Sequence, residues 1–339
     1  MVLSQLFLLY LFDFIKEIIY LPTISCMSFS LDKYTEVRNR YSAFGLNIVS
    51  EIALPELSIP DGDFDMVHVE IIEGKVPPAI ENANVSTPYV QASGSQFLFN
   101  LPGKGRILVE HGCRIIVEPT EECSYVELSV YLLCSAFGAL FHQRGITVLH
   151  SSVVKVGDSC AVFCGESGAG KSTLARCLVE RGYRLQGDDL GVIHFHEDKV
   201  PYIHPAYPQM KLWSESLDTL GHTSEGLSQV MPDMNKFRIP ADNYFHKKPL
   251  KLGKVYMLSY GDDSNVMLAS INGFRKFNLL MENIYRIQFA HAMGRSSQVF
   301  DNLKSISPFL NMNELKRPKS FEYMPNVLDA LEADFSTWS

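Results

Sequence analysis

One octapeptide restricts the fold of this chain more than any other segment: residues 165–172, Gly-Glu-Ser-Gly-Ala-Gly-Lys-Ser. It fits the pattern G-x-x-x-x-G-K-[ST] of a phosphate-binding loop, or P-loop. A short apolar run, residues 160–164, precedes it, and a helix-like run, residues 173–181, follows it. Glycines let the backbone turn tightly, so that successive N–H groups and the helix N-terminus point at phosphate oxygens. The order strand, loop, helix therefore predicts that this segment binds a nucleoside triphosphate.

Individual positions of this loop have expected roles. We expect the Lys171 ammonium to reach the β- and γ-phosphates of ATP, and the Ser172 hydroxyl to bind Mg²⁺. An ordinary glycine-rich turn is the alternative, but the sequence carries every fixed position of the pattern between suitable flanks. The predicted nucleotide-binding residues are Gly165, Glu166, Ser167, Gly168, Ala169, Gly170, Lys171, Ser172 and Thr173.

Length and composition indicate a globular protein. With 339 residues, 46% of them apolar and 20% charged, the chain has room for about two domains. The net charge is −8 and there is no basic block, which argues against nucleic acid as the main partner. The seven cysteines form no C-x-x-C pair. They predict free thiols in a reducing compartment, and hence a cytoplasmic protein.

Residues 1–27 form an extension that differs from the rest of the chain. Its apolar run, residues 6–12, is too short to span a bilayer, and no Lys or Arg precedes it. We therefore expect neither a secretory signal nor stable membrane insertion. Three interpretations stay open: an amphipathic helix, a membrane-surface anchor, or residues upstream of a true start at Met27.

The segment 28–120 predicts a small, mostly antiparallel β domain. Short β-rich runs at 47–49, 66–72, 97–100, 106–109 and 114–117 alternate with Pro and Gly turn signals. No chemical motif lies in this segment, so we expect a role in packing or substrate recognition. Residues 125–143 have the apolar spacing of a core helix that leads into the second domain, residues 121–339.

Two adjacent acids follow the helix of the P-loop. The helix is expected to end at Gly182, and a strand then leads to Asp188 and Asp189. A carboxylate at a strand end beside the phosphates suits a Mg²⁺ ligand, and a second one suits a general base. The alternative is a solvated turn into the next hairpin.

Beyond this hairpin, a polar loop at 221–235 predicts a lid. A strand at 254–259 with helices at 274–289 and 325–335 completes an alternating α/β pattern.

Residues 148–189 resemble the HPr serine kinase/phosphorylase family. His150 on a strand, a hairpin at 153–163, the P-loop, a helix ending Arg181-Gly182, and the Asp pair follow one another as in that family. The remainder resembles smaller HPr-kinase-related enzymes, including those that phosphorylate lasso-peptide precursors on a C-terminal serine. The matching segments are 41–46, 50–57, 142–145, 149–152 and 207–213. The resemblance implies an α/β fold: a P-loop kinase core of the HPr-kinase type, with a mixed sheet and flanking helices, plus a small N-terminal β-rich domain.

The resemblance also implies roles for single residues. Asp188 takes the proton from the acceptor hydroxyl, Asp189 and Ser172 hold Mg²⁺, and His150 lies beside the γ-phosphate.

Two features of the sequence depart from true HPr kinases. Their acidic metal-ligand motif after the nucleotide core is replaced by residues 210–213, which puts a second metal in doubt. Their N-terminal domain is not matched by residues 28–119, so HPr is a poor substrate guess.

Phosphoryl transfer needs cations beyond the P-loop lysine, because charge spreads over the equatorial oxygens. The candidates are Lys236 and Arg238, followed by Lys211. Each is alternatively a surface or structural base.

The sequence therefore predicts an ATP-dependent kinase that phosphorylates a serine of a peptide or protein, with the C-terminal serine of a lasso-peptide precursor as the favoured acceptor. A small-molecule kinase is one alternative, although such enzymes commonly carry Asp-x-Asp and an Arg-rich lid. A nucleotide-gated binding or assembly module is another. Whether the chain forms a homo-oligomer stays open.

Overall fold

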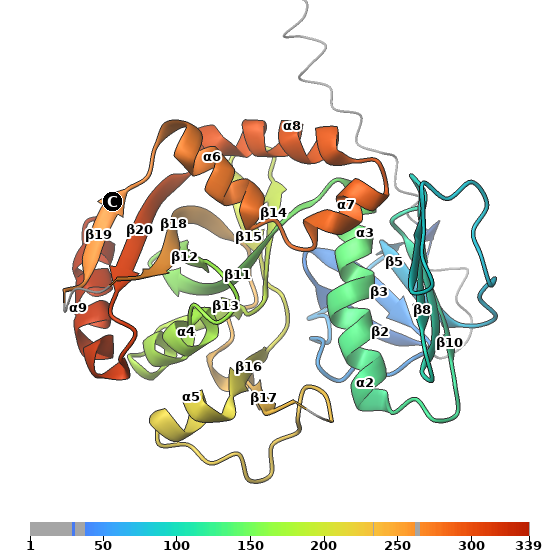
Figure 1. Cartoon of the computed structure of the whole chain (residues 1–339), viewed down its shortest axis with the longest axis horizontal. Coiled ribbons are helices and arrows are strands. Elements are labelled where there is room, and N and C mark those ends of the chain that lie inside the picture. Colours follow the sequence, from blue (N-terminus) through green and yellow to red (C-terminus); the bar gives the residue numbers. More distant parts are fainter. Residues whose placement is uncertain (1–28, 31–37, 233, 262–264, 339) are drawn as a thin grey trace, which may run out of the picture.

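The computed structural model describes residues 29–30, 38–232, 234–261 and 265–338. The extension at residues 1–27 lies outside this part of the chain, so its three interpretations stay predictions. The described residues form a mixed α/β structure with two large sheets and flanking helices, as expected (Figure 1).

The first sheet covers residues 39–119. Most neighbouring strands are antiparallel, but β3 and β10 each pair with β5 in parallel. In spatial order its strands are β2 (Asn39–Ala43), β3 (Leu46–Ser50), β5 (Val69–Glu73), β10 (Arg114–Pro119), β9 (Gly105–Glu110), β8 (Gln96–Leu101), β7 (Val90–Ala92) and β6 (Val85–Ser86). A separate short pair joins β1 (Phe29–Ser30) to β4 (Met66–Val67).

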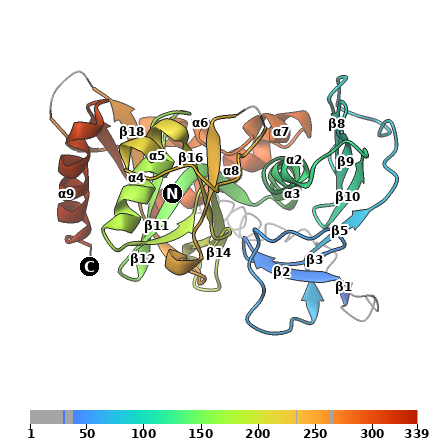
Figure 2. The same ribbon diagram turned by 90° about the horizontal axis from the view of Figure 1, so that it is seen from below.

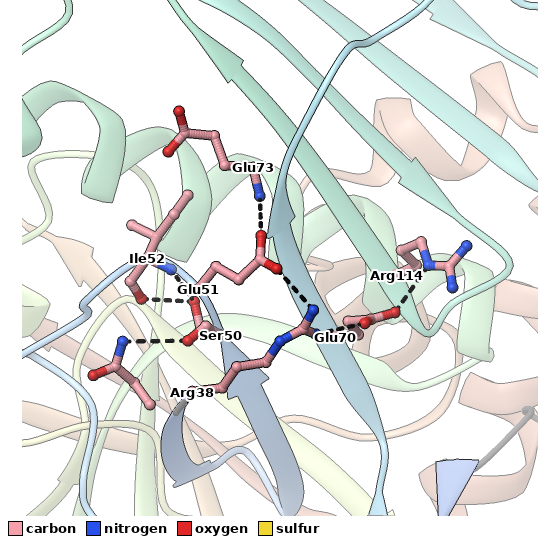
Figure 3. A network of polar contacts seen from close by, with 8 residues as sticks. Arg38, Ser50, Glu51, Ile52, Glu70, Glu73 and Arg114 are labelled. Carbon is pink, nitrogen blue, oxygen red and sulfur yellow. Dashed lines mark hydrogen bonds and ion pairs between the residues drawn. The ribbon is translucent and has the colours of Figure 1, made fainter. Parts of the chain in front are cut away.

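Ion pairs connect the parallel strands of this sheet (Figure 3). The Arg38 guanidinium lies 2.7 Å from Glu51 and 2.7 Å from Glu70, and Arg114 lies 3.0 Å from the other oxygen of Glu70. Glu51 also accepts the backbone N–H of Glu73 at 2.9 Å. The buried Glu70 carboxylate therefore has a cation on each oxygen, which compensates for its loss of water.

A long apolar helical segment packs on this sheet. It consists of α2 (Tyr125–Val130), the π-helical turn η2 (Tyr131–Ala136) and α3 (Phe137–Arg144). Its length and composition would suit a membrane span, but 67% of the relevant window is buried inside the protein. Phe137 and Phe141 share one core with Phe97 and Ile115 of the sheet and with Tyr207 of the second half. The β-rich segment is therefore packed into the rest of the protein along this helix.

The second sheet carries the glycine-rich loop. In order its strands are β12 (Ser159–Cys164), β11 (Thr147–Val156), β14 (Leu190–Phe195), β15 (Pro201–His204), β18 (Leu250–Tyr260), β20 (Asn311–Arg317) and β19 (Met267–Ser270), with β13 (Arg184–Gly187) also on β11. Strand β12 additionally pairs with β18 in parallel, so five strands close on one another. The predicted hairpin at 153–163 is confirmed, because Val156 faces Ser159 in the β11–β12 register, which leaves Gly157 and Asp158 as its two-residue turn.

Helices cover both faces of this sheet (Figure 1). Ala161 and Phe163 of β12 contact a core that includes α4 (Lys171–Glu180) and α9 (Met324–Phe335). Cys160 and Val162 point the other way, into a core with α6 (Gly273–Glu282) and α8 (Ser296–Ile306). This alternation is the two-residue period of a strand that is buried on both faces.

The prediction of one helix over residues 274–289 is wrong. Helix α6 ends at Glu282, Arg286 has a φ of 52°, and α7 (Ile287–Ala292) begins after it. Between them the backbone joins β11: His150 N–H donates to Asn283 O at 2.8 Å, and Tyr285 N–H donates to Val148 O at 2.8 Å. The apolar spacing of the sequence continues between α6 and α7, but the backbone there forms hydrogen bonds with β11 instead of helical ones. The break places Asn283 beside the glycine-rich loop.

A small hairpin completes the surroundings of that loop. It pairs β16 (Gln209–Trp213) with β17 (Lys236–Pro240), and α5 (Ser214–Thr219) follows β16 directly. Figure 2 shows β16 and α5 beside α4. Single turns η3 (Asp242–Tyr244), η4 (Ser307–Phe309) and η5 (Phe321–Tyr323) connect the remaining elements.

Candidate functional site

The glycine-rich loop, residues 165–172, runs from the end of β12 to the first turn of α4. Gly165, Gly168 and Gly170 have φ values of 145°, 85° and 85°, which side-chain-bearing residues rarely adopt. A Cβ on Gly165 would lie 2.9 Å from the carbonyl oxygen of Leu258, and one on Gly170 would lie 2.5 Å from the Arg317 guanidinium. Conformation therefore favours glycine at both positions, and at Gly165 the close backbone oxygen leaves no space for a side chain.

The first residues of α4 point into a cavity of about 710 Å³. Lys171 is buried, and its ammonium donates to the carbonyl oxygens of Gly165 (2.8 Å) and Glu166 (3.1 Å). Burial lowers the pKa of Lys171. Ser172 and Thr173 also line the cavity, and the Thr173 hydroxyl lies 3.0 Å from that of Ser216 on α5. The unpaired N–H groups at this helix start suit an anion.

Three residues that the sequence analysis did not select hold the loop in place. The Asn283 side-chain oxygen accepts the N–H of Gly165 at 2.9 Å. The Tyr260 hydroxyl donates to Gly168 O at 3.1 Å, and Arg317 donates to Ala169 O at 3.0 Å. The Arg317 guanidinium also lies 4.9 Å from the centre of the Tyr260 ring. Asn283 falls within the helix predicted over 274–289, and no motif marks Tyr260 or Arg317.

The two adjacent acids have different environments. Asp188 is buried: one carboxylate oxygen accepts the Ser152 hydroxyl at 2.6 Å, and the other accepts the Lys211 N–H at 2.9 Å. Asp189 has a φ of 70° and lines the cavity, where its carboxylate lies 2.8 Å from the Lys211 ammonium. The turn between β13 and β14 therefore sends one carboxylate inward and the other toward the loop.

These environments shift the pKa values in opposite directions. Burial and the neighbouring charge of Asp189 raise the pKa of Asp188. Burial alone would raise that of Asp189 too, but Lys211 and Lys236 hold the pKa of Asp189 well below its usual range. Burial acts to lower the pKa of Lys211, but the attractions of Asp189, Cys134 and Tyr207 together raise it. Asp189 is therefore anionic and faces the cavity.

His150 lies beside the acids. Its Nδ1 is 3.2 Å from the backbone oxygen of Asp189, and a carbonyl oxygen only accepts, so Nδ1 carries the hydrogen. Burial, with the nearby charge of Lys171, lowers the pKa of His150. The neutral ring therefore has Nε2 as its acceptor, and His150 lines the cavity.

The three candidate cations separate in the structure. Lys211 and Lys236 line the cavity, and Lys211 is the buried one of the two. Arg238 does not line it. Its guanidinium is buried against Glu56 at 2.8 Å and Ser129 at 3.0 Å. Arg238 therefore does not make the predicted contact with the phosphoryl group, but binds the first half of the chain. Lys211, the last of the three candidates, is the buried cation at the cavity.

The donor set in the cavity fits Mg²⁺. The Ser172 hydroxyl and the Asp189 carboxylate line the same space. Mg²⁺ commonly uses one or two carboxylates together with phosphate oxygens and water. Among the described residues no cluster of three His, Cys, Asp or Glu side chains forms a cage for a metal. Of the predicted lid, residues 221–235, only Asn235 lines the cavity within the part of the chain that the structure describes.

Comparison with known proteins gives little further information. No family model matches the chain, and a search of curated protein sequences finds no match. Among solved structures, the chain is similar to the HPr(Ser) kinase/phosphatase from Coxiella burnetii, with a TM-score of 0.31 and 11% identity, over 56% of this chain and 90% of that one. This similarity is weak, so the function has to be inferred from the chain's own residues.

Proposed function

We propose that this protein is an ATP-dependent kinase that transfers the γ-phosphoryl group to a serine hydroxyl of a peptide or protein. One observation supports this most: the start of α4, the anionic Asp189 and the cation Lys211 meet in a single cavity. Helix N-terminus and lysines suit phosphate oxygens, and the carboxylate suits a metal that accompanies them. A simple anion-binding turn would not need a carboxylate at that place.

The phosphates bind along the loop and the helix start. Backbone N–H groups of the loop and of Thr173 bind the α- and β-phosphates, while Lys171 turns from its carbonyl contacts toward the β- and γ-phosphates. Lys211, Lys236 and Arg317 supply positive charge around the γ-phosphoryl. Asp189 and Ser172 would hold Mg²⁺, which would neutralise charge that develops during transfer.

The proton of the acceptor is assigned to His150 instead of Asp188. A general base must come within hydrogen-bond reach of the hydroxyl. The Asp188 carboxylate is buried, with hydrogen bonds on both oxygens, whereas His150 lines the cavity and its neutral ring accepts through Nε2. The acceptor oxygen bonds to the γ-phosphorus, the bond from that phosphorus to the bridging oxygen breaks, and the hydroxyl proton goes to His150. ADP leaves with the bridging oxygen.

The identity of the acceptor rests on sequence resemblance. The resemblance at 41–46, 50–57, 142–145, 149–152 and 207–213 supports a peptide serine, and specifically the C-terminal serine of a lasso-peptide precursor. In the structure, residues 142–144 have a structural role. Gln143 accepts the Gly112 N–H and donates to Val109 O, which fastens the helix to the first sheet.

Incubation with ATP labelled on its γ-phosphate, Mg²⁺ and serine-containing peptides tests this function. The expected result is label on serine, and its loss in Lys171→Ala. If label leaves ATP only as free phosphate, the protein is a nucleotide-gated module and the kinase proposal fails.

The assignment of His150 has its own test. Because the pKa of His150 is lowered, transfer should decline with acid only below the ordinary value of 6.5, and this acid limb should be absent from the residual activity of His150→Gln. An unchanged rate and profile in that variant would exclude His150 as the proton acceptor.

A further inference from the structure

A second cavity, of about 960 Å³, adjoins the glycine-rich loop. Strand β18, helix α6 and strand β20 form its walls, and the beginning of the loop, residues 165–169, forms its border. The two cavities share His150, Ser167 and Gly168, together with Tyr260 and Lys319. They therefore meet where His150 faces the loop.

The two cavities differ in charge. Among the described residues that line the first cavity, five cations face two acids: Lys171, Lys211, Lys236, Arg317 and Lys319 against Asp189 and Glu215. Those that line the second include two cations and three acids: Arg275 and Lys319 against Glu166, Glu282 and Glu314. A triphosphate needs a surplus of cations. Only the first cavity provides that surplus.

The direction in which the chain runs through the loop also indicates that the nucleotide lies in the first cavity. The N–H groups at the helix start bind the α- and β-phosphates, so the body of the nucleotide lies on the side of Thr173, which lines only the first cavity. The γ-phosphoryl then lies toward the beginning of the loop. The acceptor oxygen must approach roughly in line with the bond that breaks, from the side opposite the leaving ADP. That side opens into the second cavity.

We infer that the second cavity holds the acceptor, and that it takes a neutral or basic segment of polypeptide instead of a phosphorylated or polyanionic metabolite. This inference rests on the proposed kinase function. The walls combine apolar side chains, Met257, Leu258 and Leu279, with acids, which suits a peptide with apolar and basic residues. Glu314 is already paired with Arg275 at 2.6 Å. The exposed Glu166 and Glu282 are thus the acids placed to contact basic side chains of the acceptor, and Glu282 is the one that lies outside the glycine-rich loop.

A matched pair of bulky substitutions tests which cavity holds the nucleotide. Leu279→Trp narrows the second cavity, and Thr219→Trp narrows the first from α5. Binding of a fluorescent ATP analogue with Mg²⁺ should stay within about twofold of wild type in Leu279→Trp and weaken about tenfold or more in Thr219→Trp. Equal weakening in both variants, or the reverse order, would overturn the assignment. Thermal unfolding of each variant checks that it folds.

Acceptor chemistry is tested with a degenerate library of serine-containing peptides and γ-labelled ATP. Leu279→Trp should lower labelling about tenfold or more, and Glu282→Lys should shift the preferred peptides from basic toward acidic. Full labelling by Leu279→Trp, an unchanged preference in Glu282→Lys, or transfer to phosphorylated metabolites instead of peptides contradicts the inference. If the wild-type protein labels neither peptides nor metabolites, the kinase proposal itself is contradicted. The binding of the ATP analogue to Leu279→Trp and Thr219→Trp then still shows which cavity holds the nucleotide.

Discussion

The ammonium of Lys211 lies 2.8 Å from the carboxylate of Asp189, while the backbone N–H of the same residue donates to Asp188 at 2.9 Å. One residue of β16 therefore holds both members of the acid pair. Its ammonium also lies 3.2 Å from the Cys134 sulfur, in the π-helical turn η2. The hairpin β16–β17 thus fixes the positions of the charges at the end of β13.

Replacement of Lys211 by Met removes the ammonium but keeps the backbone N–H on Asp188. Asp189 then loses its closest cation, and the γ-phosphoryl loses a positive neighbour. We expect phosphoryl transfer to fall about 100-fold or more, because groups that stabilise developing charge have effects of this size. Steady-state transfer measures the loss. Lys248→Met, on the exposed surface, is the matched control and should transfer normally. Equal transfer rates in Lys211→Met and Lys248→Met would show that Lys211 takes no part in phosphoryl transfer.

Arg238 and Glu56 form a buried ion pair at 2.8 Å, with both side chains at least 90% covered. Arg238→Met leaves Glu56 buried without its cation, which is expected to cost about 3–5 kcal/mol of unfolding free energy. The double variant Arg238→Met/Glu56→Gln should recover part of this loss. Urea unfolding measures both. The exposed pair Arg40–Asp63 is the control, and Arg40→Met should cost less than about 1 kcal/mol. A loss of that small size at Arg238 would show that the pair is not structural.

Part of the fold follows from the sequence. The strand, loop and helix around residues 165–172, the hairpin at Gly157-Asp158 and the helix at 325–335 depend on local signals: glycine spacing, a two-residue turn and apolar period. The break after Glu282 does not. Its cause is hydrogen bonding to β11, a strand more than 120 residues away, which no local pattern contains.

The residues of the site also differ in whether the sequence alone identifies them. Motif and spacing select Lys171, Ser172, Asp189 and His150 as candidates, and all four line the same cavity. Arg238 and Lys211 were ranked in the wrong order, since both are cations in one hairpin and sequence does not say which faces the cavity. In the β16–β17 register Lys211 lies opposite Arg238, yet one contacts Asp189 and the other Glu56. Tertiary contacts decide which cation reaches the site.

Several histidines between the two halves of the chain make stability depend on pH. Burial, with Arg144 nearby, lowers the pKa of His194 to about 4, and burial with the charge of His194 lowers that of His204 to about 3. His194 also contacts the backbone oxygen of Phe44 at 3.0 Å, and His196 lies 2.8 Å from His204.

In the unfolded chain these histidines bind protons near pH 6.5, so below that value the unfolded state takes up more protons than the folded one. Stability should therefore fall as the pH decreases from 6.5 toward 4. The urea midpoint at pH 7 and pH 5 measures this, and His204→Asn should reduce the difference. An equal midpoint at both pH values would contradict it.

The most direct test of the kinase site is the rate of phosphoryl transfer in Asp189→Asn and Asp188→Asn, measured with nucleotide bound. The structure predicts that Asp189→Asn still binds nucleotide through the loop but transfers about 100-fold more slowly or worse. Asp188→Asn should mainly lower the unfolding midpoint, because an amide cannot accept from both Ser152 and Lys211. The opposite result, near-normal transfer in Asp189→Asn and complete loss in a stably folded Asp188→Asn, would contradict it.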